Sequence, residues 1–459
     1  MLLRLTCACL VAGSFCFGAD VTYTHDVAPI LFEHCTKCHH PDDVAPMSLL
    51  SYRETRPWAK SIRAAVIQRK MPPWHADPHY GDFSNDARLT DAQIETIKTW
   101  VDAGAPEGDR KDMPAAPRYA EGWRLGPPDA IVQIPEDYVV KAGAEDQYVF
   151  MNVPTHFDHD VWVQALELRP GNRRVVHHAH VYLHEPAKGE LGVIIRKPSE
   201  DDKDPNNGPG FTFRQAGLEH ARPNAPVADD GCAGPNGGLW PGEKEDEMSS
   251  MLSSFLPGKD PDRFPDGYAR KIPAGSTIQF QIHYHALPNE DQTDRTSVGI
   301  YFSKEPPRQA LRRIDIHNQM FRIPAGDPNH RVTACYTFPK AVELMSYTAH
   351  MHLRGKDMRF DAVHPDGRRE TLFSVPRYDF NWQTEYKLRK PVYLEKGTRM
   401  EITAHFDNSA NNPANPDPTK VIRWGEPSYE EMMDGWFEFI LPEKDAGVNV
   451  AASAPLAAE

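Results

Sequence analysis

Two cysteines and a histidine near the start of the chain have the spacing of a covalent haem attachment site. They form the run Cys35-Thr36-Lys37-Cys38-His39. Two thiols at this spacing can add to the two vinyl groups of a haem, while His39 places an imidazole on the iron. The motif therefore predicts haem c bound through Cys35, Cys38 and His39. The alternative interpretation is a chance match or half of a zinc site.

A second ligand to the iron is expected from the segment Lys70-Met71-Pro72-Pro73-Trp74. A thioether that follows a predicted helix and precedes two prolines can be held rigidly towards the iron. We therefore predict Met71 for this role, in a position that resembles that of the methionine ligand in class I cytochromes c. Met47, His75 and His79 stay open as alternatives.

Three histidine-rich runs occur farther along the chain, each in a pattern typical of a β-strand. They are Val175-Val176-His177-His178-Ala179-His180, Ile282-His283-Tyr284-His285 and Ala349-His350-Met351-His352. Side chains at i and i+2 lie on the same face of a strand, roughly 6 to 7 Å apart, so one pair can share a metal ion. A single pair is more often a hydrogen-bonded polar face, but three pairs favour metal binding. Imidazoles suit copper, zinc, iron and nickel, and a nearby thioether favours copper.

A methionine after acidic residues completes a recognisable order of motifs. With the run Glu430-Glu431-Met432-Met433, the sequence resembles the copper type II, ascorbate-dependent monooxygenases over roughly residues 120 to 442. That family includes peptidylglycine hydroxylating monooxygenase and dopamine beta-hydroxylase. The resemblance implies one electron-storing copper and one oxygen-binding copper. The implied ligands are His177, His178 and His283 for the first, and His350, His352 and Met432 for the second.

The sequence also departs from that family. Peptide-hydroxylating members have an arginine two residues before the His-x-His pair, which helps to bind the substrate carboxylate, and a tyrosine four residues after the methionine. Thr348 and Trp436 stand at these positions. A peptide that ends in glycine is therefore a poor candidate for the substrate. His180 and His285 are additional to the family pattern, and their roles stay open.

Export is predicted from the first 19 residues. Arg4 precedes an apolar run, and Phe17-Gly18-Ala19 ends in the small residues that a signal peptidase accepts. A periplasmic or extracellular protein is expected, without stable membrane insertion because no later apolar run is long enough to span a bilayer. The net charge of −14 opposes binding to nucleic acid. Whether Cys232 pairs with Cys335 stays open.

The elements that would position these residues change in character along the chain. Helical patterns at 27–34, 57–70 and 89–103 give way to short alternating runs after a Pro- and Gly-rich linker. The predicted fold class is a small all-α cytochrome c domain followed by two antiparallel β-sandwich (jelly-roll-like) domains. The predicted segments are a signal peptide at 1–19, the cytochrome domain at 20–108, a linker at 109–128, sandwiches at 129–305 and 306–445, and a tail at 446–459, with a surface insertion at about 197–267.

These patterns lead to one hypothesis and two alternatives. The hypothesis is an exported copper-dependent monooxygenase with haem c and two copper ions. It would activate molecular oxygen and hydroxylate a C–H bond of an unidentified small organic or peptide-like substrate. The haem would pass on electrons from an external donor, either a redox protein or a small reductant. The alternatives are a non-catalytic multi-centre electron-transfer protein and a cytochrome fused to ligand-binding β-sandwiches.

Overall fold

A computed structural model describes most of the chain after the predicted signal peptide. The described residues are 21–41, 43, 45–120, 122–144, 147–184, 228–232, 251–256, 258–425 and 427–442. The predicted signal peptide, the predicted tail and most of the predicted insertion lie outside them. The chain divides into two compact units: the first comprises 1–73 and 87–118, and the second comprises 74–86 and 119–459.

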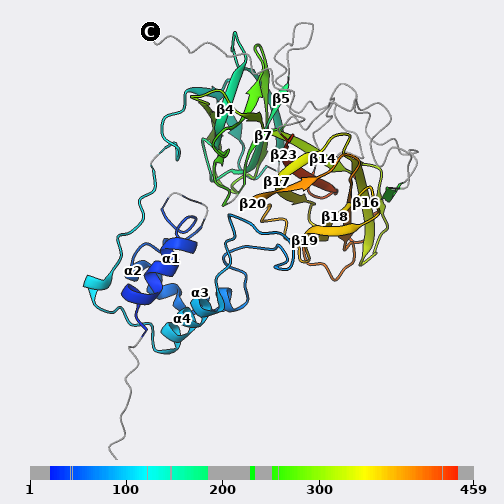
Figure 1. Ribbon diagram of the computed structural model, residues 1–459. Helices are drawn as coiled ribbons and strands as arrows, with labels where there is room; N and C mark the ends of the chain where they lie inside the picture. The colour runs from blue at the N-terminus through cyan, green and yellow to red at the C-terminus, as the bar shows by residue number, and fades with distance from the viewer. Residues whose placement is uncertain are drawn as a thin grey trace, which may run out of the picture. The chain divides into compact units, whose positions relative to one another are not determined.

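The first unit consists of short helices around a small hydrophobic core (Figure 1). Its longest helix, α4, begins with a capping box in which the side chains of Thr90 and Gln93 each accept a hydrogen bond from the other residue's backbone N–H. Ile97 and Trp100 of α4 are fully buried in the core, together with Leu31. The elements are the π-helix η1 (Tyr23–Val27), α1 (Ala28–His34), α2 (Tyr52–Thr55), the 3₁₀ helix η2 (Arg56–Trp58), α3 (Ala59–Ile67), α4 (Asp91–Asp102) and the 3₁₀ helix η3 (Arg110–Asp112).

The second unit begins with strands that form a six-stranded sheet, a four-stranded sheet and a two-stranded sheet. The six-stranded sheet has the order β1-β12-β4-β9-β13, with β8 paired to β4, and the four-stranded sheet has the order β3-β10-β5-β7. Val163 and Ile300 of the former and Phe280 and Ile282 of the latter are fully buried in one core. The strands are β1 (Ala130–Gln133), β2 (Tyr138–Val140), β3 (Gln147–Pro154), β4 (Val161–Arg169), β5 (Val176–His184), β7 (Met251–Phe255), β8 (Asp262–Arg263), β9 (Tyr268–Ile272), β10 (Thr277–Tyr284), β11 (Gln292–Asp294), β12 (Ser297–Phe302) and β13 (Gln309–Ala310).

Most of the remaining strands form a four-stranded sheet, β14-β23-β17-β20, and a five-stranded sheet, β19-β18-β21-β16-β6. Phe437 and Tyr347 of the first sheet pack against Phe360 of the second. Gly435 is required for this approach, because a Cβ atom there would lie 2.3 Å from Ile402. The strands are β6 (Asp230–Gly231), β14 (Arg312–His317), β15 (Arg322–Ile323), β16 (His330–Thr337), β17 (Val342–His350), β18 (Gly355–Val363), β19 (Arg369–Val375), β20 (Tyr386–Leu394), β21 (Arg399–Phe406), β22 (Ile422–Arg423) and β23 (Asp434–Ile440).

The predicted fold class, an all-α cytochrome c domain followed by two antiparallel β-sandwich (jelly-roll-like) domains, is wrong. The structure is mostly small β-sheets, strand makes up 38% of the described residues, and no all-α cytochrome domain is evident. The helices are short, and the longest has 12 residues. The sheets are not purely antiparallel either, because β9 and β13 run parallel, as do β6 and β16.

Residues 74–86 show one physical reason for this error. These residues come shortly after the predicted helix at 57–70 and belong to the predicted cytochrome domain. In the structure they pack within the second unit. Trp74 and Phe83 both pack against Tyr386. Their ring centroids lie 4.9 and 5.5 Å, respectively, from that of Tyr386. The free energy gained by burying these aromatic side chains among the strands decides where the segment packs, although it is next to the helices in sequence.

A buried ion pair links the two groups of sheets in the second unit. Arg270 of β9 bonds Glu438 of β23, and both side chains are largely buried. Arg270 also donates to the backbone carbonyls of Met251 and Leu252, at 2.9 Å each. Because an uncompensated charge in this position would be costly, the two side chains compensate each other between β9 and β23.

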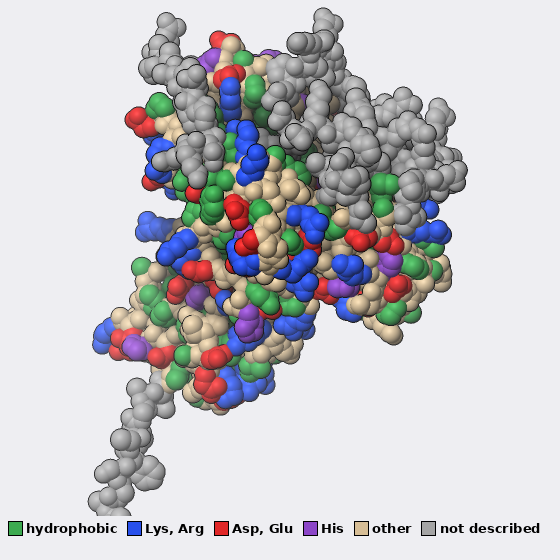
Figure 2. Space-filling view, turned by 45° about the vertical axis from the view of Figure 1, so that its right-hand side comes forward, with side chains coloured by type: hydrophobic (Ala, Val, Ile, Leu, Met, Phe, Trp, Pro, Cys, Tyr) green, Lys and Arg blue, Asp and Glu red, His purple; other side chains and the backbone are tan. Residues whose placement is uncertain are grey.

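Two features concern the surface of the protein: whether any helix could cross a membrane, and how the charged side chains are distributed. No helix among the described residues is long and apolar enough to cross a membrane. Figure 2 shows Lys and Arg side chains intermingled with Asp and Glu on the face in view. The net negative charge is therefore not gathered into one acidic patch on that face.

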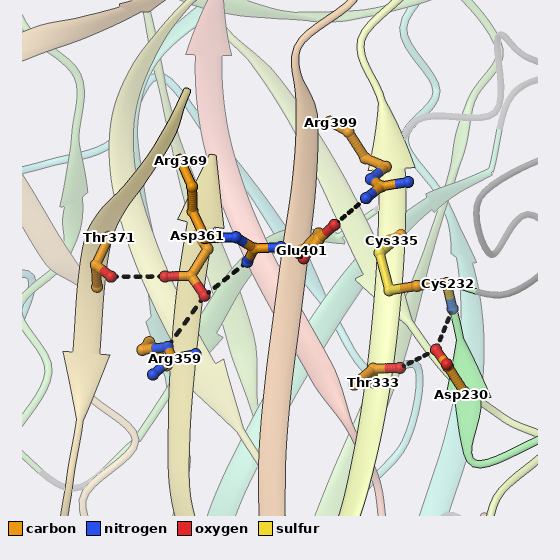
Figure 3. A network of polar contacts seen from close by, with 10 residues as sticks. All are labelled: Asp230, Cys232, Thr333, Cys335, Arg359, Asp361, Arg369, Thr371, Arg399 and Glu401. Carbon is orange, nitrogen blue, oxygen red and sulfur yellow. Dashed lines mark hydrogen bonds and ion pairs between the residues drawn. A yellow bond between two sulfur atoms is a disulfide. The ribbon is translucent and has the colours of Figure 1, made fainter. Parts of the chain in front are cut away.

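Cys232 and Cys335 are joined by a disulfide next to a network of charged side chains on the five-stranded sheet (Figure 3). Asp361 lies at the centre of this network and is 1% exposed. Its carboxylate accepts hydrogen bonds from Thr371, Arg359 and Arg369 at 2.6, 3.0 and 3.2 Å. These contacts are the compensation that a buried carboxylate requires.

We expect Asp361→Ala to lower the free energy of unfolding by about 3 kcal/mol, because it removes the anion that pairs with two arginines. Chemical denaturation of the purified protein measures this change. Asp266→Ala, at an exposed turn residue, is the control and should change the value by less than about 0.5 kcal/mol. Equal effects of the two substitutions would contradict a stabilising role for the network.

Candidate metal centres

A β-bulge brings two consecutive histidines to the same place. In the pairing of β5 with β10, His178 lies opposite His283 and Val176 lies opposite Tyr284, so that His177 is the extra residue. In a regular strand His177 and His178 would point to opposite faces of the sheet. A bulge re-aims a side chain locally, and here it lets both histidines approach His283.

The three imidazoles converge through their Nδ1 atoms. Nδ1 of His178 lies 3.1 Å from Nδ1 of His177 and 3.4 Å from Nδ1 of His283. Nitrogen ligands at about 2.0 Å from a tetrahedral metal ion are separated by about 3.3 Å, so these separations match a metal site. The ligand atoms of the three residues lie within 4.8 Å of one another. The structure thus brings His177, His178 and His283 together as a group that fits one ion.

The surroundings bury two of these imidazoles and hold them in place. His178 and His283 are 8% and 4% exposed. Tyr148 of β3 stacks on His283 with ring centroids 4.3 Å apart and an angle of 8° between the planes. Burial, followed by the neighbouring histidines, lowers the pKa of His178 well below its usual value. A neutral imidazole is the form that binds a metal ion.

A second pair of histidines lies at the end of β17. His350 is the last residue of the strand and His352 follows it, and their ring centroids are 5.2 Å apart. They are 6% and 4% exposed. Burial lowers the pKa of His350 to about 4 and that of His352 well below its usual value. Both rings are therefore neutral near pH 7 and available as ligands.

Hydrogen bonds at Nδ1 orient the two rings, so that Nε2 is the nitrogen of each ring that could bind a metal ion. Nδ1 of His350 lies 2.8 Å from Oε1 of Gln383, and Nδ1 of His352 lies 3.3 Å from the carbonyl oxygen of Glu430. Since both partners are acceptors, each Nδ1 carries the proton. Such bonds fix the tautomer and the direction of a metal-ligating histidine.

Glu431 holds the backbone of this site. Its carboxylate accepts hydrogen bonds from the backbone N–H groups of His352 and Arg354, at 2.8 and 2.5 Å. Glu431 is fully buried, and this burial raises its pKa to about 8 against the lowering effect of the donated hydrogen bonds. The residue that precedes Met432 thus ties it to the loop that bears His352.

Met432, rather than Met433, lines the cavity that contains these histidines. Met433 is fully buried, whereas Met432 is partly exposed and lies on the cavity wall with His350 and His352. The cavity has a volume of about 180 Å³ and is also lined by His178. His178 of the first group and the three residues of the second group therefore face one space within the second unit.

Trp436 and His180 complete the wall between the two groups. Trp436 stacks on His350 with ring centroids 4.9 Å apart and planes at 15°. It lies 6.3 Å from the ring of His180, which is buried and has no hydrogen-bond partner for its Nδ1 among the described residues. His285, by contrast, is exposed. Of the two additional histidines, only His180 is among the residues that line the cavity.

The predicted haem attachment motif lies in the first unit, immediately after α1. Cys35 caps α1, and the N–H groups of Cys38 and His39 both donate to its carbonyl oxygen, at 3.1 and 3.0 Å. Nδ1 of His39 lies 3.3 Å from the carbonyl oxygen of Met47, which leaves Nε2 as the nitrogen that can bind iron. Burial, followed by the nearby Cys38, raises the pKa of the Cys35 thiol to about 12. Cys35, Cys38 and His39 thus lie on one hydrogen-bonded turn after α1.

The four candidates for the second iron ligand belong to different units of the structure. Met71 follows α3 and belongs to the first unit, as does Met47, which packs against the core. His75 and His79 belong to the second unit. Only the two methionines lie in the same unit as His39.

Several residues of the sites were missed in the sequence analysis. Gln383 comes from a loop with no histidine nearby in sequence, and no local signal marks it. Tyr148 lies directly opposite His283 in the pairing of β3 with β10, which the sequence does not specify. Asp315 and His317 share one face of β14. Their Asp-x-His spacing is the same alternating signal that identified the histidine pairs, and it was overlooked.

Comparisons with known proteins supply no family. No protein-family model matches the chain, and no curated protein sequence matches it. Among solved structures, a Paenibacillus xanthan lyase is 10% identical with a TM-score of 0.18, over 69% of this chain and 26% of the lyase chain. The structure of the infectious bursal disease virus Gx strain is 8% identical with a TM-score of 0.15, over 68% of this chain and 80% of that one. Neither similarity is strong enough to support an argument about fold or function.

We expect Gln383→Ala to weaken copper binding at the His350 and His352 group about tenfold or more, because the ring of His350 loses the acceptor that orients it. Competition with a chromophoric Cu(I) chelator measures the affinity. Gln279→Ala is a matched control, since Gln279 also lines the cavity but bonds Asn152. An equal loss in both variants would show that Gln383 does not act through His350.

Proposed function

We propose that this chain is an exported monooxygenase that binds haem c and two copper ions and hydroxylates a C–H bond of a small organic or peptide-like substrate. One observation supports the proposal above all others. A group of three converging histidines and a group of two buried histidines and a methionine lie in the second unit, and His178 of the first group lines the same cavity as His350, His352 and Met432 of the second. Their order along the chain resembles that in the copper type II, ascorbate-dependent monooxygenases.

The donor atoms suit copper. His177, His178 and His283 would hold one ion through their Nδ1 atoms. His350, His352 and Met432 would hold the other, and the thioether favours the cuprous state. Copper at these positions would supply one-electron steps and the activation of dioxygen. The difference between the two donor sets agrees with different roles, electron storage at the first group and oxygen chemistry at the second.

The reaction requires two electrons and two protons for each molecule of dioxygen. One oxygen atom enters the C–H bond to give C–OH, and the other leaves as water. The haem at Cys35, Cys38 and His39 would accept electrons one at a time from an external redox protein or small reductant. Periplasmic or extracellular export agrees with covalent haem attachment and with the Cys232–Cys335 disulfide.

The protein's own residues prepare the cavity. Gln383 and the carbonyl of Glu430 keep the protons of His350 and His352 on Nδ1. Trp436 covers one face of the His350 ring, which limits its movement and excludes water from that side. An aromatic wall next to the oxygen-binding group favours an apolar part of the substrate at that point.

Copper stoichiometry is the first test of this proposal. We expect the exported, haem-containing protein to bind about two copper ions per haem, and His350→Ala to bind about one, with loss of one cupric EPR signal. His405→Ala is the matched control, because His405 pairs with Asp357 on β18 and lies outside the cavity lining. Haem without stoichiometric copper would overturn the proposal.

Reoxidation of the haem by dioxygen tests the reaction. With copper bound, the reduced haem should be reoxidised faster in the wild type than in His350→Ala. Equal rates, with two copper ions bound in the wild type, would favour an electron-transfer protein without oxygen chemistry.

The second iron ligand provides a further prediction. We expect Met71→Ala to abolish the haem–methionine charge-transfer band and to lower the reduction potential, because a thioether ligand stabilises ferrous haem. Visible spectroscopy and redox titration measure the two changes. Met47→Ala should retain the band, since the hydrogen bond of His39 is to the backbone carbonyl of Met47, which alanine preserves. The reverse pattern would assign the ligand to Met47.

A further inference from the structure

A third group of potential metal ligands lies on the wall of the same cavity. It consists of Asp315, His317 and Asp434, whose donor atoms lie within 4.8 Å of one another. None of the three belongs to the proposed copper ligands. All three line the cavity that contains His178 and His350.

Strand register produces this group. In the pairing of β14 with β23, His317 lies directly opposite Asp434. Asp315 precedes His317 by two residues and therefore lies on the same face of the sheet. Side chains on directly opposite residues of antiparallel strands have Cβ atoms about 4.5 to 5.5 Å apart. The group is thus set by the backbone of two paired strands and not by a loop.

Asp315 gives independent support for a ligand. Its Oδ1 atom is buried and has no hydrogen-bond partner among the described residues. Its Oδ2 atom lies 3.7 Å from Nδ1 of His317, too far for a hydrogen bond. A buried carboxylate oxygen without a partner is costly, and a cation between Asp315, His317 and Asp434 would remove that cost.

The donor chemistry distinguishes this group from the two histidine groups. Two carboxylates and one imidazole contribute a formal charge of about −2 and mainly oxygen donors. Such a set suits a divalent ion of hard or borderline character, such as Mn²⁺ or Zn²⁺, whereas imidazole with thioether suits copper. We propose that Asp315, His317 and Asp434 bind a divalent cation that prefers oxygen ligands.

The position of this cation suggests its purpose. β23 pairs with β14 on one side and with β17 on the other, so that Asp434 lies between His317 and His350 in one row across the sheet. Three protein ligands leave coordination positions open for an oxygen atom of another molecule. If the proposed monooxygenase function holds, the cation would anchor a carboxylate, hydroxyl or carbonyl of the substrate beside the His350 group. The metal site itself does not depend on that function.

Mn²⁺ is a suitable probe because His-rich and methionine-containing groups bind it weakly. The full-length, haem-containing protein is freed of copper and titrated with Mn²⁺, and EPR measures the Mn²⁺ that stays free in solution. We expect one bound Mn²⁺ per chain in the wild type and its loss in both Asp315→Asn and Asp434→Asn. The two variants preserve side-chain shape, and thermal unfolding verifies that they are folded.

Two controls make the result specific. Asp357→Asn removes a carboxylate that bonds His405 at 2.7 Å outside the cavity lining, and it should retain the bound Mn²⁺. His350→Ala should also retain it, which separates this site from the proposed copper site. Copper stoichiometry of Asp315→Asn, measured in parallel, should stay at the wild-type value. The inference is overturned if the wild type binds no Mn²⁺ at millimolar concentration, or if Asp315→Asn binds it as the wild type does.

Discussion

Much of the candidate site in this protein depends on the alternation of side chains along one strand, β23. Its residues Phe437 and Phe439 are buried in the hydrophobic core, while Asp434, Trp436 and Glu438 point to the other face. Because β23 is paired on both sides, any slip of its register by one residue would exchange these two sets. The core aromatics therefore keep Asp434 and Trp436 at the cavity and Glu438 at Arg270. Packing on one face of the strand positions the chemistry on the other.

The histidines that lie close together could be selected from the sequence, but the backbone geometry that brings them together could not. The spacing of His350 and His352 predicts that they lie close together, but the strand ends at His350, and a hydrogen bond from the backbone N–H of His352 to Glu431 holds the second residue. The convergence of His177 with His178 is different, since adjacent strand residues normally diverge and only the bulge opposite His283 unites them. A bulge depends on the partner strand, so it cannot be read from β5 alone.

The fold class was not predictable in the same way, because it depends on contacts between distant segments. Helical periodicity and the cap at Thr90 correctly mark a helix at Asp91–Asp102. Periodicity does not reveal that Trp74 and Phe83 leave the neighbouring helices and pack on Tyr386. Nor does the two-residue length of β6 and β13 give a sequence signal for their parallel pairings. Local patterns thus identified elements, whereas burial among distant aromatic residues decided their assembly.

The cavity contains two kinds of side chain that burial affects in opposite ways, imidazoles that must be neutral and carboxylates that are charged. Metal-binding imidazoles must be neutral, which burial favours by lowering the pKa values of His178 and His350. A carboxylate oxygen such as Oδ1 of Asp315 loses free energy when it is buried without a hydrogen-bond partner. Both kinds of group line one space here, and the guanidinium of Arg313 already contributes a positive charge near Asp315. Cations bound near both groups would meet that cost, and the protein would then retain a neutral imidazole and an anionic carboxylate on neighbouring strands at the same pH.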